Sequence, residues 1–174
     1  MNMIVKTSMK HIFKLTTLFA LLFIVPVINV QANPFLENFD KNAFYAAMAG
    51  ENVEELNTIL TRLKETTIPE KAAYEGALLM KKAGLVKKPK DKLSLFKLGH
   101  IKLEAIIKAD EDNIEYRFLR LMIQENAPKI VKYKSDLKND TALIIKSFRK
   151  LPPVVQQAIK DYSKNSKFLK PSDF

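Results

Sequence analysis

Residues 92–126 read KLSLFKLGHIKLEAIIKADEDNIEYRFLRLMIQEN and contain the two most apolar helices that the sequence predicts. In the first half, apolar residues recur every three or four positions on two sides, a pattern typical of a helix covered by neighbours. In the second half, Asp112 is placed to cap a helix, and Glu115 three residues later completes a capping-box pair. The acidic turn of residues 110–112 joins the halves. We therefore expect two internal helices that form a core hairpin.

The rest of the chain also predicts helices joined by short turns. Apolar stripes of helical period place them at residues 40–49, 52–63, 69–84, 140–150 and 154–162, with no convincing segment of period two. Small residues around Gly76 are expected to let a neighbouring helix approach closely. Residues 129–137 fit an extended segment or a loose helical turn. The predicted fold class is all-α, with about seven helices packed as stacked antiparallel hairpins or as an irregular bundle.

Two short segments support the prediction of helical hairpins. Residues 44–56, FYAAMAGENVEEL, resemble the helix–turn–helix of an ankyrin-type repeat without its hairpin loop. Residues 104–113, EAIIKADEDN, are similar to the second helix and exit turn of a tetratricopeptide repeat, with Glu111 in place of the usual proline. No strict repeat of about 34 residues runs through the chain. The resemblance implies stacked helix pairs, in which polar residues of a buried helix often line a concave binding face.

Residues 1–32 have the features of a secretory signal peptide. Lys6, Lys10 and Lys14 form a basic leader, and the apolar run that follows is short for a membrane span of about 20 residues. We expect cleavage between Ala32 and Asn33, with an uncleaved membrane anchor as the alternative. Residues 33–162 then form a single domain, and residues 163–174 form a flexible basic tail. Export to a bacterial periplasm or to the extracellular space is expected, with no transmembrane segment after cleavage.

The charge of the chain favours anionic partners. The 29 basic residues exceed the 19 acidic residues by ten, and removing the three leader lysines leaves a net charge of +7. The candidate basic surface near the C-terminus consists of Lys146, Arg149, Lys150, Lys160 and Lys164. The aromatic residues of these helices, Phe148 and Tyr162, are expected on the inward faces, so the basic face carries no aromatic side chains for base stacking and nucleic acid is not expected to bind. The alternative is an ordinary solvated surface.

No catalytic or metal-binding pattern is visible in the sequence. His100 is the only histidine after the leader, and the only nearby acid on its helical face is Glu104. Zinc sites need at least three protein ligands, so we expect a structural histidine hydrogen-bonded to Glu104. The chain has no cysteine and no glycine-rich phosphate loop. We expect a non-enzymatic protein with no cofactor and no metal.

The candidate partner-binding site is the polar strip of Arg117, Arg120 and Gln124 on the second central helix. Arginine pairs suit bidentate bonding to a carboxylate, so we expect this strip to contact an acidic group of a partner, or otherwise to be solvated surface. The sequence thus favours an exported interaction module that binds a protein or peptide. The alternative is an envelope-surface protein that binds anionic lipid or polysaccharide through a basic face.

Overall fold

The computed structural model describes residues 39–174, which belong to one compact unit. These residues contain helices and no strands, which confirms the predicted all-α class. The predicted signal peptide and its cleavage point lie outside the described residues. No helix in the described part of the chain combines the length and the apolar character needed to cross a membrane.

The α-helices of this part are α2 (Lys41–Ala49), α3 (Val53–Lys64), α4 (Lys71–Leu85), α5 (Pro89–Ala109), α6 (Ile114–Asn126), α7 (Leu137–Ser147) and α8 (Pro153–Ser163). The 3-10 helices within residues 39–174 are η2 (Lys129–Val131), η3 (Phe148–Lys150) and η4 (Pro171–Asp173).

Local capping explains where several helices begin. The carboxylate of Asp40 accepts hydrogen bonds from the backbone N–H groups of the first turn of α2, and Asn52 caps α3 in the same way. The expected cap of α6 is wrong by one residue, because the side chain of Asn113 accepts the bond from the Tyr116 N–H. Glu115 does not form a capping box, since its carboxylate points into the core.

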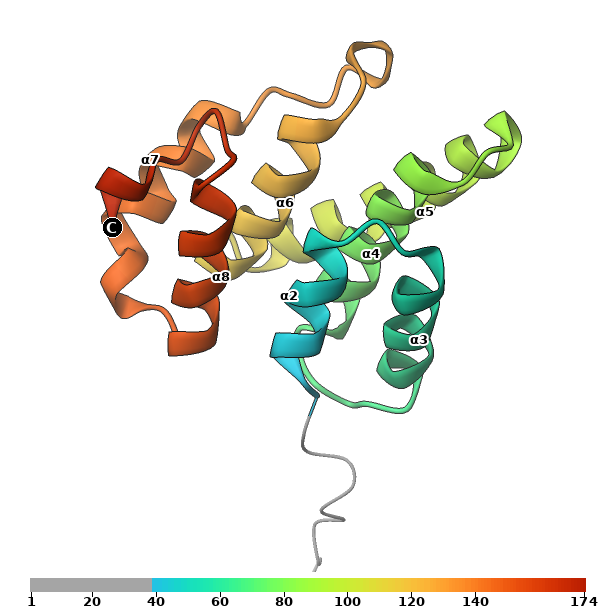
Figure 1. Ribbon diagram of the computed structural model, residues 1–174, viewed down its shortest axis with the longest axis horizontal. Coiled ribbons are helices and arrows are strands. Elements are labelled where there is room, and N and C mark those ends of the chain that lie inside the picture. The colour runs from blue at the N-terminus through green and yellow to red at the C-terminus, as the bar shows by residue number, and fades with distance from the viewer. Residues whose placement is uncertain (1–38) are drawn as a thin grey trace, which may run out of the picture. The chain divides into compact units, whose positions relative to one another are not determined.

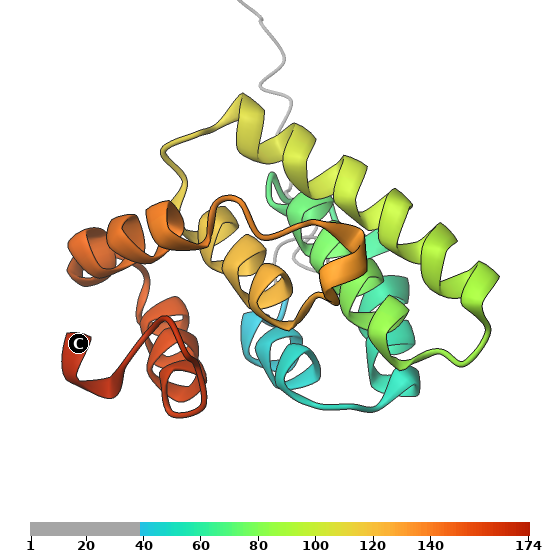
Figure 2. The same ribbon diagram turned by 90° about the horizontal axis from the view of Figure 1, so that it is seen from above.

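The α4–α5 hairpin is the most extensive helix pair in the described residues. Figures 1 and 2 show α5 lying along α4, with their connecting turn at the edge of the described residues. Two glycines allow this contact. A Cβ atom on Gly99 would lie only 2.5 Å from the carbonyl oxygen of Gly76, and one on Gly76 would lie 2.9 Å from the carbonyl oxygen of Gly99. The close approach predicted at Gly76 is therefore present, and its partner is α5.

The expectation that α5 is internal is wrong. Its inner residues Leu103 and Ile107 are buried, but Leu93, Leu98 and Ile101 are 60%, 49% and 63% exposed. α5 packs along α4 and meets α6 less extensively, so its outer side is left uncovered. By contrast, α6 is central as predicted, and α4 and α7 pack against it. The most extensively packed hairpin is therefore α4–α5 at the side of the domain, and α6 lies at the centre of the helices.

The C-terminal residues are packed against the domain rather than forming the expected flexible tail. Leu169 is fully buried, and the ring of Phe174 lies 4.5 Å from the ring of Phe148. The hydroxyl of Ser166 donates a hydrogen bond of 2.7 Å to Glu125 on α6. The free energy gained by burying these apolar side chains holds the segment against the domain, although the neighbouring lysines favour contact with water. The folded domain thus extends to the end of the chain instead of stopping at residue 162.

Residues 129–137 contain a short helical turn followed by a reversal. Lys132 adopts a left-handed backbone conformation with φ of 50° directly after η2. Tyr133 is buried, and its hydroxyl donates a hydrogen bond to Glu104 on α5. This segment therefore connects α6 to α7 and also covers part of α5.

Candidate functional site

The predicted partner-binding strip lies in an internal network of ion pairs. The guanidinium of Arg120 donates hydrogen bonds of 2.7 and 2.8 Å to the two carboxylate oxygens of Asp140, and one of 3.1 Å to Glu104. Arg117 donates a further bond of 3.1 Å to Asp140, whose side chain is fully buried. The amide of Gln124, also fully buried, donates to Asp136 at 3.1 Å. The expectation of an accessible strip is therefore wrong for Arg120 and Gln124.

The positive charge of these arginines is already more than offset by neighbouring carboxylates. A shallow hollow of about 270 Å³ adjoins them, and it is lined by Glu104, Ile107, Lys108, Glu111, Arg117, Arg120 and Asp136. Burial lowers the pKa of Arg120, but the hydrogen bonds and negative charge of Asp140, with smaller contributions from Glu104 and Asp136, raise it above its ordinary value. With Asp140 included, four carboxylates face three cations. A partner's carboxylate would have to compete with all of them, so the hollow does not favour an anionic ligand.

A second polar cluster joins α2, α4 and α6 around Glu115. Its carboxylate accepts hydrogen bonds from the hydroxyls of Tyr45 at 2.9 Å and Tyr74 at 2.6 Å, and from the ammonium of Lys41 at 3.0 Å. Lys41 also pairs with Glu70 at 3.3 Å. Burial, followed by the negative charge of Glu115, raises the pKa of both tyrosines. Both hydroxyls therefore stay protonated at neutral pH and serve as hydrogen-bond donors rather than as bases.

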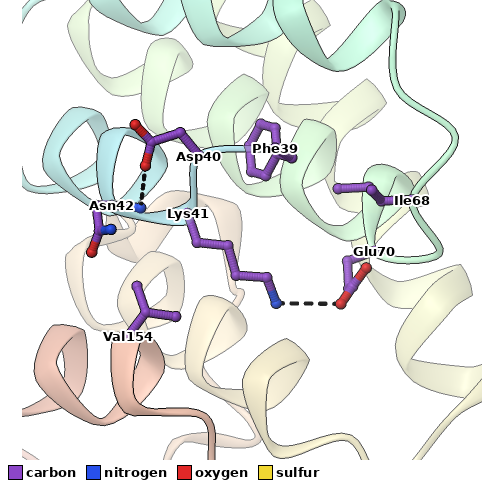
Figure 3. A pocket seen from close by; sticks show the side chains of 7 residues that line it. All are labelled: Phe39, Asp40, Lys41, Asn42, Ile68, Glu70 and Val154. Carbon is purple, nitrogen blue, oxygen red and sulfur yellow. Dashed lines mark hydrogen bonds and ion pairs between the residues drawn. The ribbon is translucent and has the colours of Figure 1, made fainter. Parts of the chain in front are cut away.

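An open hollow of about 640 Å³ lies beside this cluster. Figure 3 shows Lys41 extending across it toward Glu70, with Phe39 on one side and Val154 of α8 on the other. The lysine charge is neutralised by its two carboxylate partners. We assign this cluster a structural role, because each of its charged groups is satisfied by a neighbour in the core.

His100 has a different environment from the one expected. Its ring packs edge-on against Tyr133, with 4.8 Å between centroids, and lies stacked 6.2 Å from Phe96. The predicted hydrogen bond to Glu104 is not formed; that carboxylate instead accepts bonds from Tyr133 and Arg120. Within residues 39–174, no group of three histidine or acidic side chains is arranged to hold a metal ion.

The five predicted basic residues near the C-terminus are all exposed. Lys164, directly after α8, pairs with Asp161 at 2.6 Å, and the ammonium of Lys160 on α8 lies 5.6 Å from the ring centroid of Phe148. Because Phe148 begins η3, Lys160 lies next to the segment that carries Arg149 and Lys150. The structure thus places Lys160 of α8 beside η3, and the binding role of these basic residues stays a prediction.

A second basic surface lies at the turn between α4 and α5, and the sequence reasoning did not identify it as a site. We call this the hairpin tip and define it by the exposed lysines Lys87, Lys88, Lys90 and Lys92. None of them pairs with a carboxylate of the described residues, and the only acid among residues 81–97 is Asp91. Figures 1 and 2 both show the turn at the edge of the described residues, away from the C-terminus. The dense run of lysines was the available signal.

Comparisons with protein-family models, with curated proteins and with solved structures find no match to this chain. The local resemblance to helical-hairpin repeats therefore stays a prediction.

Proposed function

We propose that this chain is an exported, non-enzymatic protein that binds an anionic surface of the cell envelope through exposed lysines. The observation that carries the proposal is the hairpin tip, where four exposed lysines are accompanied by a single acid, Asp91. Unpaired surface cations attract anionic polymers and lipid headgroups, and they raise the rate of encounter with both. The basic residues of α7, η3 and α8 add to the same overall charge.

The buried arginines make the protein- or peptide-binding alternative less favourable. That alternative relied on Arg117 and Arg120 meeting an acidic group of a partner, but Asp140 already occupies both guanidinium groups. Breaking a buried ion pair is strongly unfavourable, by about 3–5 kcal/mol. Binding through the exposed lysines breaks no buried ion pair. Binding of an anionic surface through these lysines is therefore more favourable than binding of a partner's acidic group by the arginines.

The arrangement of the remaining polar groups also supports a non-enzymatic role. The tyrosines and the carboxylate around Glu115 bond to one another, and the side chain of His100 packs between aromatic rings. General acid–base catalysis requires a base within reach of both a substrate and a positioning group in a cleft. In the two hollows described above, Lys41 is instead already paired with Glu70, and Arg120 is already paired with Glu104 and Asp136.

The proposal is tested by measuring how binding depends on salt. The exported protein is titrated with vesicles that contain phosphatidylglycerol and, separately, with dextran sulfate, using neutral vesicles and dextran as controls. We expect binding to the anionic probes alone and a steep loss with added salt, because the screening length falls from about 10 Å at 0.1 M to about 3 Å at 1 M. Failure to bind either anionic probe at low salt would refute the proposal.

Export is tested separately by mass spectrometry of the protein recovered from the envelope. A mature N-terminus at Asn33 is expected, and retention of residues 1–32 would favour the membrane-anchor alternative.

A further inference from the structure

The outer side of α5 carries apolar side chains that have no role in binding an anionic surface through lysines. Five large hydrophobic side chains are exposed among the described residues, and three of them, Leu93, Leu98 and Ile101, lie on α5. Leu98, Ile101 and the exposed Ala105 are three and four residues apart, so they form a row on one side of the helix. Gly99 and Leu103 face α4, which places this row on the uncovered side. We call Leu98, Ile101 and Ala105 the apolar row.

We infer that the apolar row rests in the headgroup region of an anionic lipid bilayer while the lysines of the hairpin tip bind lipid phosphates. This inference rests on the proposed function and names its partner as lipid rather than polysaccharide. A hydrated polysaccharide offers no apolar surface in which a leucine or isoleucine is shielded from water. A bilayer does, because the apolar face of an interfacial helix is buried about 5–10 Å into the boundary between headgroups and acyl chains.

The lysines beside the apolar row suit such a surface. Lys97 and Lys108 are exposed and lie one row away on the same side of α5. A lysine can lay its aliphatic stem along apolar surface while its ammonium group reaches the headgroups. The helix also exists before contact, since the backbones of Gly76 and Gly99 hold it tightly against α4. Binding therefore does not require an unfolded segment to become ordered, which lowers its entropic cost.

The two ends of α5 carry opposite charge, and this sets the orientation. The hairpin tip at the N-terminal end is basic, whereas the exposed residues Asp110, Glu111 and Asp112 follow the C-terminal end. A helix of 21 residues separates the ends by about 31 Å. An anionic bilayer attracts the first end and repels the second. The helix is therefore tilted, with Leu98 deeper in the interface than Ala105.

Tryptophan reporters test the contact and the tilt directly, because the chain contains no tryptophan. Leu98→Trp, Ala105→Trp and Ile145→Trp each place one indole on the surface of the exported protein; Ile145 is an exposed hydrophobic residue of α7 and serves as the matched control. With vesicles containing phosphatidylglycerol, we expect a blue shift and quenching by brominated acyl chains at position 98, less at 105 and none at 145. Quenching at 145 without quenching at 98 would overturn the inference.

Charge variants separate the two basic surfaces. One variant replaces the tip with Lys87→Gln, Lys88→Gln, Lys90→Gln and Lys92→Gln, and the matched variant carries Lys146→Gln, Arg149→Gln, Lys150→Gln and Lys160→Gln. Each lysine near an anionic bilayer contributes about 5-fold in binding, so the tip variant should lose several hundred-fold in affinity for the vesicles. The matched variant should lose far less. All eight positions are exposed, and thermal melting checks that both variants fold.

An apolar variant separates lipid from polysaccharide. Leu98→Ser with Ile101→Ser should weaken binding to the vesicles by about 100-fold and leave binding to dextran sulfate unchanged. Ile130→Ser, at a residue 87% exposed outside α5, should change neither. If the double variant binds vesicles as well as the native chain, the lipid inference fails while the proposed function stands. If the native chain binds neither probe, the proposed function itself fails.

Discussion

The contact between the backbones of α4 and α5 predicts a large penalty for a single added methyl group at Gly99. In Gly99→Ala, the new Cβ would lie 2.5 Å from the Gly76 carbonyl oxygen and 2.8 Å from the Cγ of Met80, whereas ordinary contacts begin at 3.4 Å. A methionine side chain can move aside, but the Gly76 carbonyl belongs to a helix backbone. The helices would therefore have to separate by roughly 1 Å along a close-packed interface.

The expected magnitude follows from two opposing effects. Overpacking of a core costs about 1–3 kcal/mol, and a clash with rigid backbone belongs at the upper end of that range or above it. Alanine has a higher helix propensity than glycine by about 1 kcal/mol, which offsets part of the cost. We expect Gly99→Ala to lower the free energy of unfolding by about 2 kcal/mol.

Gly84→Ala is the matched control for this prediction. Gly84 is exposed on α4, and a Cβ there would meet no atom within 4 Å. The same chemical change should therefore raise the free energy of unfolding, by up to about 1 kcal/mol. Urea denaturation followed by circular dichroism measures both variants. If Gly99→Ala were as stable as Gly84→Ala, the interhelical contact would not constrain residue 99, and the reasoning would be refuted.

Three further predictions concern the polar clusters and the C-terminus. Asp140→Ala should destabilise the fold by about 3–5 kcal/mol in urea denaturation, because it leaves Arg120 buried without its main partner, whereas the exposed Asp161→Ala should give no measurable change. Leu169→Ala should lower stability by about 2–5 kcal/mol if the C-terminal residues pack as described, and a neutral result in the same assay would show that they do not. The raised pKa of Tyr74 should make stability fall as the pH rises through 10.0, since the unfolded state loses this proton first. Denaturation measured from pH 8 to 11 checks this, and Tyr74→Phe should show a weaker dependence.

The sequence predicted the candidate surfaces only in part. It identified the exposed basic residues on α7, η3 and α8, because a lysine-rich polar face on an amphipathic helix is normally solvated. The sequence predicts Arg120 on an accessible strip, because helical periodicity only separates the polar and apolar faces of one helix. It carries no information about an acidic residue on another helix. Asp140 lies 20 residues away in the chain, and only folding brings its carboxylate to the guanidinium. A polar face was therefore mistaken for an outer face.

The helices of this protein follow largely from residues that are close together in the chain, whereas contacts between helices establish which helix faces are covered. Helix starts and ends depend on neighbours in the chain: Asp40 and Asn52 supply caps, and Pro153 occupies the first turn of α8. Burial depends on partners far apart in the chain. α5 has apolar residues nearly all round, yet the Gly76–Gly99 contact turns one side to α4 and leaves Leu98 and Ile101 outside. Periodicity gives the same signal for an apolar face that is buried and for one that is exposed, because contacts between helices determine which apolar faces are covered.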